Sequence, residues 1–143
     1  MPLRLIPHLH RLVHRIALDL ARSDEFQASQ PEAHVLAFLA SSGDSTIADV
    51  QRAFAHKKST LTSVLDRLVE RGYVTRTTSE SDRRTFDVRL TAEGRRVAVR
   101  VYRHFEALEK RLLRHAGKGD LEALQRIALA AEALDAPPAA RKA

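Results

Sequence analysis

The sequence predicts a mainly α-helical protein with one small β hairpin, an α+β fold. Apolar residues recur with the helical period of about 3.6 along most of the chain, and the period changes to about 2 in one short stretch. Capping residues and glycines mark the ends of these segments. The chain has 143 residues, 44% of them hydrophobic, so we expect a single domain with a real core.

Two helices are expected in the first third of the chain. Leucine and isoleucine recur every three or four residues from about residue 4 to residue 22, which predicts an amphipathic helix. Ser29 and Glu32 have the spacing of a capping box, in which each side chain accepts a hydrogen bond from the other residue's amide. A second helix therefore follows Ser29 and ends near Gly43.

Two further helices, joined by a tight turn, come next. Thr46 and Asp49 repeat the capping-box spacing and begin a short helix. The following helix has apolar residues at i, i+3, i+4, i+7 and i+8, which are Leu61, Val64, Leu65, Leu68 and Val69. Gly72 supplies the left-handed residue that ends this helix after Arg71.

The hairpin follows Gly72. Residues 73–78 and 86–90 are rich in β-forming residues and predict two strands, which residues 79–85 join through a polar tip. Thr91 caps a long helix with a nearly heptad apolar repeat, which should pack against another helix. Asp120 caps a last helix, and residues 135–143 are a Pro and Ala tail, flexible over 136–143.

The basic charge is concentrated in one block. The chain carries a net charge of +6, yet residues 51–104 hold 13 Lys and Arg against 6 Asp and Glu, a net of +7. Such a block is expected of a protein that neutralises phosphates, and a solvated basic face is the alternative.

Composition argues against several classes of protein. The absence of cysteine excludes disulfides, thiolate metal sites, cysteine nucleophiles and thiol redox sensing. No apolar run approaches the roughly 18 residues of a membrane span, and Arg4, His8, His10 and Arg11 interrupt any signal-peptide core, so we expect a cytoplasmic protein without a membrane partner. No phosphate loop, H-E-x-x-H motif or nucleophile elbow is present, so we expect no enzyme, no catalytic residue and no cofactor.

This order of elements is that of a winged helix-turn-helix, which places one helix in a major groove and a hairpin tip in an adjacent groove. In the helix after the turn, Ser59, Ser63, Asp66 and Glu70 face away from the core, flanked by Thr60, Thr62 and Arg67. Small hydroxyl side chains allow close approach to base edges, while Lys57, Lys58 and the helix N-terminus favour phosphate. A plain surface helix is the alternative.

The hairpin tip carries Asp82, Arg83 and Arg84. Its two guanidinium groups suit a narrow minor groove, and the carboxylate could hold one of them extended. A solvated turn with a surface ion pair is the alternative.

Residues 46–94 resemble the winged helix of the MarR family of bacterial transcriptional regulators. The resemblance covers the helix-turn-helix from Thr46 to Val50, the segment from Ser59 to Val74, Arg76, the wing motif Asp82-x-Arg84 and the motif Leu90-Thr91-x-x-Gly94. The last two of these motifs are weak singly, but at family spacing behind the R-L-x-x-R-G-Y-V helix end they make the resemblance specific. The expected terminal helices also fall where the family has them.

The resemblance implies a homodimer. Residues 4–30 and 91–135 would supply dimerisation helices, and residues 31–90 would form the winged helix-turn-helix. The dimerisation contacts would come from apolar residues of the first and last two helices, namely Leu5, Leu9, Leu12, Ile16, Phe105, Leu108, Leu112, Leu124 and Ile127.

The resemblance also implies a DNA partner, with two recognition helices in successive major grooves of a pseudo-palindromic operator. The contacts would come from Lys57, Lys58, Ser59, Thr60, Thr62, Ser63, Arg67, Asp82, Arg83 and Arg84. Arg84 would enter the minor groove, Asp82 would orient it, and Arg83 is a phosphate candidate.

The function so implied is that of a sequence-specific repressor released by a small anionic or phenolic ligand. The alternative is an architectural DNA binder without sequence preference, or a protein-interaction module. The hydroxyl-rich helix face and the wing arginine favour the specific regulator.

The sequence departs from the family pattern at three positions of the helix-turn-helix. Gln51 replaces a small alanine, Ala55 a turn glycine and Lys57 a Ser or Asp cap, which puts the angle between the two helices in question. Lys57 cannot accept the first amides of the helix, so we expect this helix start to be frayed until phosphate binds.

Three histidines lie on the first helix. His10 and His14 have the i, i+4 spacing that could supply two imidazoles to zinc, with His8 nearby, but no further ligand set accompanies them. Interfacial or solvated histidines are the favoured interpretation, and no metal is expected.

Overall fold

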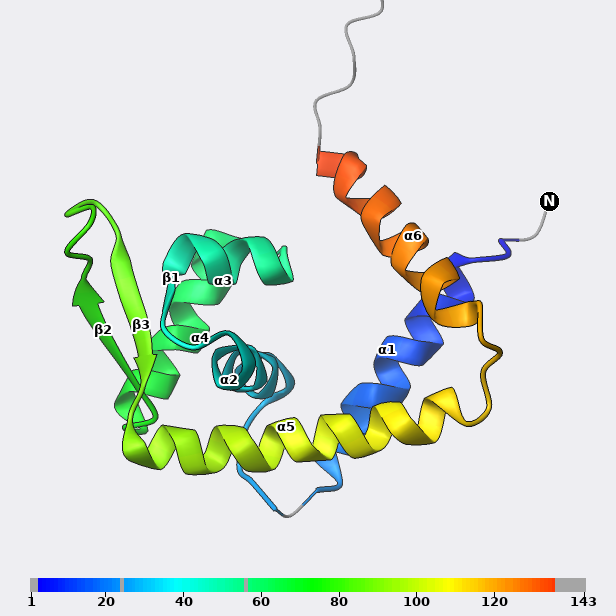
Figure 1. Ribbon diagram of the computed structural model, residues 1–143, viewed down its shortest axis with the longest axis horizontal. Coiled ribbons are helices and arrows are strands. Elements are labelled where there is room, and N and C mark those ends of the chain that lie inside the picture. Colours follow the sequence, from blue (N-terminus) through cyan, green and yellow to red (C-terminus); the bar gives the residue numbers. More distant parts are fainter. Residues whose placement is uncertain (1–2, 24, 56, 136–143) are drawn as a thin grey trace, which may run out of the picture. The chain divides into compact units, whose positions relative to one another are not determined.

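The computed structural model describes residues 3–23, 25–55 and 57–135 (Figure 1). They belong to two units, residues 1–104 and 105–143, and the boundary falls within one long helix. The helices dominate and a small sheet accompanies them, so the predicted mainly α class is confirmed. No helix among the described residues is both long and apolar enough to cross a bilayer.

The first unit contains most of the secondary structure, and Figure 1 shows its hairpin beside α3 and α4. Its elements are α1 (Ile6–Ala21), α2 (Gln30–Ser42), β1 (Ser45–Thr46), α3 (Ile47–Phe54), α4 (Lys58–Glu70), β2 (Val74–Thr78), β3 (Phe86–Leu90) and the first part of α5 (Ala92–Leu113). Each predicted helix and strand of this unit is present, with ends shifted by one or two residues.

The sheet has three antiparallel strands in the order β1-β3-β2. In the hairpin, Val74 pairs with Leu90 and Thr78 with Phe86. The third strand, β1, was not predicted and pairs Ser45 with Val88. Because β1 directly precedes α3, this pairing attaches the start of the helix-turn-helix to the hairpin.

Both predicted capping boxes form. The Glu32 amide donates to Ser29 Oγ at 3.4 Å, and the Ser29 amide donates to Glu32 Oε2 at 2.9 Å. In α3 the equivalent bonds between Asp49 and Thr46 measure 3.1 and 3.0 Å. These local bonds fix where α2 and α3 begin because they satisfy amides that have no partner within the helix.

The core lies within the first unit. It is built from side chains of α2, α3, α4, the sheet and the first turns of α5, including Leu36, Leu39, Val50, Leu61, Val64, Leu65, Leu68, Val88, Val97 and Val101, all at most 2% exposed. The apolar stripe predicted for α4 is therefore its buried side, except that Val69 is exposed.

The end of α4 and the start of α5 are joined closely. Gly72 has a φ of 72°, as expected for the residue that ends α4. Thr91 caps α5 as predicted, because its Oγ1 accepts the Gly94 amide at 2.9 Å, and its own amide donates to the Tyr73 carbonyl at 3.0 Å. A Cβ on Gly94 would lie 1.7 Å from that Tyr73 oxygen, so only glycine fits there.

The second unit contains the last turns of α5, helix α6 (Asp120–Glu132) and a short 3₁₀ helix, η1 (Ala133–Asp135). The prediction that Asp120 is the cap of the last helix is wrong by one residue. Gly119 occupies the cap position, while Asp120 already has helical backbone and its carboxylate accepts the Gly117 amide. The tail was predicted to begin at Asp135, but this residue belongs to η1, and the remainder of the predicted tail, residues 136–143, lies outside the described residues.

Candidate nucleic-acid interface

The exposed side of α4 begins with lysines and continues with hydroxyl side chains. All six residues expected to face DNA in its first two turns are exposed, namely Lys57, Lys58, Ser59, Thr60, Thr62 and Ser63. Thr62 Oγ1 donates to the Lys58 carbonyl at 2.9 Å, and Ser63 Oγ donates to the Ser59 carbonyl at 3.2 Å. Hydroxyls that donate into their own helix keep lone pairs facing outward, so this surface can accept hydrogen bonds.

The turn between α3 and α4 carries two of the departures from the family pattern. Ala55 adopts the left-handed conformation, with a φ of 49° and a ψ of 27°, so it takes up the backbone geometry expected of glycine. Lys57 is the N-cap of α4, and no side chain caps this helix. The first amides of α4 therefore present partial positive charge beside the two lysines. The fraying expected at this helix start stays a prediction.

An ion pair holds α4 to the start of α2. Arg67 Nε donates to Glu32 Oε1 at 2.9 Å, and Arg71 Nη1 lies 3.7 Å from Glu32 Oε2. The Glu32 side chain is 1% exposed, whereas that of Arg67 is 49% exposed. Burial alone would raise the pKa of Glu32, but the Ser29 amide and the two arginines outweigh it and hold the pKa below its usual value.

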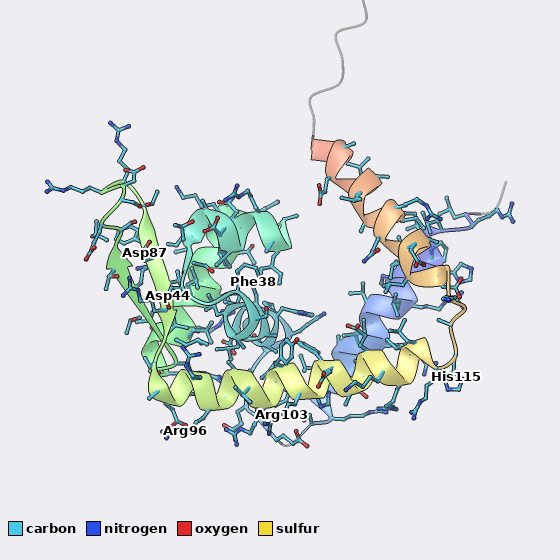
Figure 2. The ribbon with its side chains drawn as sticks, viewed as in Figure 1. Phe38, Asp44, Asp87, Arg96, Arg103 and His115 are labelled. Carbon is cyan, nitrogen blue, oxygen red and sulfur yellow. The ribbon has the colours of Figure 1, made fainter. Side chains whose placement is uncertain are left out.

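A second ion pair joins α4 to the wing. Arg76 of β2 places Nη1 3.3 Å from Asp66 Oδ1, and its guanidinium lies 5.5 Å from the centre of the Phe86 ring. Asp66 is therefore paired with a wing residue. At the base of the hairpin, Arg89 lies 3.3 Å from Asp44 and 3.8 Å from Asp87, and both acids are labelled beside β3 in Figure 2.

The wing tip is a defined turn built on Asp82. Its Oδ1 accepts the Arg84 amide at 2.9 Å, and its carbonyl accepts the Thr85 amide at 2.9 Å. The Ser79 amide closes the turn on the Thr85 carbonyl at 2.9 Å. The sequence suggested that the carboxylate would hold a guanidinium, whereas its contact here is with the backbone of Arg84.

The two arginines of the tip are exposed. Neither forms an ion pair within the part of the chain that the structure describes. Figure 2 shows nitrogen-ended side chains projecting outward from the hairpin tip. Asp82 fixes the backbone from which Arg84 extends, and both guanidinium groups can meet an external anion.

The apolar residues expected at a dimer interface are all left partly or fully exposed. In the first unit these are Leu5, Leu9, Leu12 and Ile16 of α1. In the second unit they are Phe105, Leu108 and Leu112 of α5, with Leu124 and Ile127 of α6. Helix α6 has no buried residue.

Two of the three histidines of α1, His10 and His14, lie next to each other on one side of that helix. The rings of His10 and His14 stack with centres 6.2 Å apart, and Arg11 is hydrogen-bonded to His8 Nδ1 at 2.9 Å. Across the described ranges, no group of three or more His, Asp or Glu side chains could hold a metal ion.

The contacts of several residues that organise this surface were not predicted from the sequence, where Arg76 was named only as part of the family resemblance. Glu32 was expected only as a helix cap, although it also binds the two arginines of α4. Arg76 and Arg89 brace the hairpin through contacts with residues distant in sequence. The two arginines follow Glu32 by 35 and 39 residues, so no local sequence pattern indicates that they pair with it.

Comparisons with known proteins identify similar chains. A family model described as the MarR family matches residues 28–85. An uncharacterised HTH-type transcriptional regulator of Bacillus subtilis, YfiV, is 31% identical over 84 residues, which are 59% of this chain and 52% of that protein. The chain thus spans about half the length of this curated relative.

Solved structures match over nearly the whole chain. The PcaV transcriptional regulator of Streptomyces coelicolor, in complex with its natural ligand, has a TM-score of 0.74 and 25% identity over 92% of this chain and 99% of that one. MepR of S. aureus bound to DNA has a TM-score of 0.77 and 17% identity over 94% and 100% of the two chains. FabT of Streptococcus pneumoniae bound to DNA has a TM-score of 0.71 and 22% identity over 90% and 96%.

Proposed function

We propose that this chain is a MarR-family regulator, a homodimeric, sequence-specific DNA-binding transcriptional repressor of the cytoplasm and not an enzyme. The match of the MarR family model to residues 28–85 and the similarity to an HTH-type regulator support this proposal. The observation that carries this proposal is the combination of an exposed, hydroxyl-lined face on α4 with two wing-tip arginines that form no ion pair among the described residues. Both lie within the block of the chain whose net charge is +7.

The α4 surface suits a major groove. Its first two turns expose small side chains, which let the helix approach base edges closely. The outward lone pairs of Thr62 and Ser63 would accept from base amino groups, which adenine and cytosine present in that groove. Lys57 and Lys58, at the positive end of the helix, would meet the flanking phosphates.

The wing suits the adjacent minor groove. A turn fixed by four hydrogen bonds around Asp82 and Thr85 presents Arg84 and Arg83 from a defined backbone. Arginine is favoured where the minor groove is narrow and its potential most negative. The ion pair of Arg76 holds the hairpin to α4, and that of Arg89 holds it to Asp44, the residue before β1. The wing and α4 would therefore bind DNA as one surface.

Exposed apolar side chains on α1, α5 and α6 support dimerisation. Leu5, Leu124 and Leu112 are each more than 40% exposed, and a second copy of the chain would bury such residues. A two-fold dimer carries two α4 helices, which would meet half-sites about 10 base pairs apart. The structure of PcaV with its natural ligand supports release by a small molecule, and we expect an anionic or phenolic one.

The direct test is binding to the DNA upstream of the chain's own gene, against a scrambled fragment of equal length. Fluorescence anisotropy at several salt concentrations should give at least about a 10³-fold preference for the native fragment, with two chains per site. Equal binding to both fragments, falling steeply with salt, would support the architectural alternative.

Arg84→Ala tests the wing. It removes one guanidinium that has no ion-pair partner among the described residues, so operator affinity should fall about tenfold while dimer mass and thermal midpoint stay unchanged. Arg95→Ala, which removes an exposed arginine of α5, is the matched control for lost charge. If both variants weaken binding equally, Arg84 contributes only its positive charge and makes no specific contact in the minor groove.

Ser63→Leu tests base readout by α4. The exposed serine lies on the outer side of the helix, so a bulky replacement should change the preferred bases without unfolding the protein. The measurement is selection of binding sites from a random DNA library with both proteins. Identical selected sites, with a uniform loss of affinity, would contradict base contact at this position.

A further inference from the structure

We propose that Glu32, a buried acid of α2, is a positioning residue for DNA binding that orients Arg67 of the recognition helix toward a DNA phosphate. This inference rests on the proposed function and deepens it. Glu32 would not touch DNA itself. It would act through Arg67, whose inner edge binds the carboxylate and whose outer edge would bind the phosphate.

Both oxygens of the Glu32 carboxylate are held. Oε2 accepts the Ser29 amide at 2.9 Å and faces Arg71 Nη1 at 3.7 Å, while Oε1 accepts Arg67 Nε at 2.9 Å. The side chain is 1% exposed, so water competes little for these bonds. A carboxylate fixed in this way defines the position of the guanidinium that binds it.

Arg67 uses only its inner edge in this contact. Within the described part of the chain, its side chain makes no other hydrogen bond or ion pair, and half of its surface is exposed. Its two terminal nitrogens therefore form a fork that can bind a second anion.

The position of Arg67 on α4 points to phosphate. Thr60, Ser63 and Arg67 are at i, i+3 and i+7 and share one exposed face of the helix. The first two turns of such a helix meet base edges, whereas Arg67 lies in the third, where the helix leaves the groove.

The other capping box of this unit offers a matched comparison. Asp49 caps α3 as Glu32 caps α2, and it also pairs with an arginine, but this partner is Arg52 of its own helix. Asp49 thus has the same local chemistry without a bond to α4. Its substitution tests whether losing a capping acid is enough to weaken DNA binding.

The experiment is a double-mutant cycle on the full-length protein, read by operator affinity and by the dependence of affinity on salt. Glu32→Gln and Arg67→Ala should each weaken operator binding about tenfold and each lower the salt slope by about 1. The double variant should bind no more weakly than Arg67→Ala alone, because Glu32 acts through that arginine. Asp49→Asn should retain the salt slope of the native protein.

Two results would overturn the inference: native affinity and salt slope in Glu32→Gln, or fully additive losses in the double variant. Should Glu32→Gln not fold, Arg67→Lys decides, because lysine keeps the charge but has a single nitrogen, which cannot occupy both the Nε position at Glu32 and the terminal positions that face outward. The inference predicts that Arg67→Lys binds as weakly as Arg67→Ala, and native affinity in Arg67→Lys would contradict it. If the native protein shows no operator preference, the proposed function has failed first.

Discussion

Gly94 of α5 sets a sharp limit on how this chain can fold. A Cβ at this position would lie 1.7 Å from the Tyr73 carbonyl oxygen and 2.6 Å from its carbon, whereas ordinary contacts begin near 3.4 Å. Both clashing atoms are backbone, so no side-chain rotation relieves the overlap. In Gly94→Ala the start of α5 must therefore move away from Tyr73 by roughly 1.5 Å.

The cost of that movement follows from what it disrupts. The Thr91 amide bonds the Tyr73 carbonyl at 3.0 Å, and Thr91 Oγ1 donates to the Gly72 carbonyl at 2.6 Å, each worth about 1 kcal/mol. Val97, one turn further on, is buried, and loosening its packing costs about 2 kcal/mol. Alanine regains about 1 kcal/mol of helix propensity, so the net loss is about 3 kcal/mol.

Urea unfolding followed by circular dichroism measures this loss. All proteins are compared at one concentration because dimerisation would make stability concentration-dependent. Gly94→Ala should lower the unfolding midpoint by about 1 to 2 M. Gly119→Ala is the control, since a Cβ there meets nothing within 4 Å, and it should stay within about 0.5 kcal/mol of the native protein. A Gly94→Ala protein as stable as this control would refute the close-approach argument.

Three more predictions concern stability. Ala55→Gly should raise the free energy of unfolding by about 1 kcal/mol, because alanine at a φ of 49° is strained, and a loss in urea unfolding would contradict this. Glu32 and Asp49 have lowered pKa values in the folded protein, so they stabilise it above their ordinary values of 4.5 and 3.8. In an acid titration, the free energy of unfolding should fall as the pH drops below about 4.5 through these lowered pKa values, and it should fall less steeply in Glu32→Gln. An identical decline in the two proteins would contradict a contribution from Glu32. Arg76→Gln should cost less than about 1 kcal/mol, since its partner Asp66 is half-exposed, yet speed amide exchange in the hairpin, and unchanged exchange would mean that this pair does not hold the wing.

The helix boundaries were predictable because their signals are local. Ser29 with Glu32, Thr46 with Asp49, and Thr91 at the start of α5 each form cap bonds over three residues, a distance at which sequence spacing fixes geometry. The error at Asp120 is also local, a shift of one residue in the start of α6. Gly119 takes helical backbone without being part of the helix, and no residue type signals that shift of one position.

Interactions between distant segments were harder to predict. Strand β1 has two residues, too few to show alternation, and exists because Ser45 pairs with Val88. Arg67 was expected only at the DNA surface, and its bond to Glu32 depends on how α2 and α4 pack. The spacing of Asp82 and Arg84 suggested that the carboxylate could hold a guanidinium, whereas in the structure it accepts the Arg84 amide, which the sequence alone does not distinguish.

The central claim is that two copies of the α4 and wing surface bind one DNA site together. Hydroxyl-radical footprinting of the protein on the fragment upstream of its gene tests this directly. We expect two protected segments centred about 10 base pairs apart. The minor grooves on their outer flanks should also be protected, and this flanking protection should disappear in Arg84→Ala. Protection spread evenly along the fragment, or one segment that Arg84→Ala leaves intact, would contradict it.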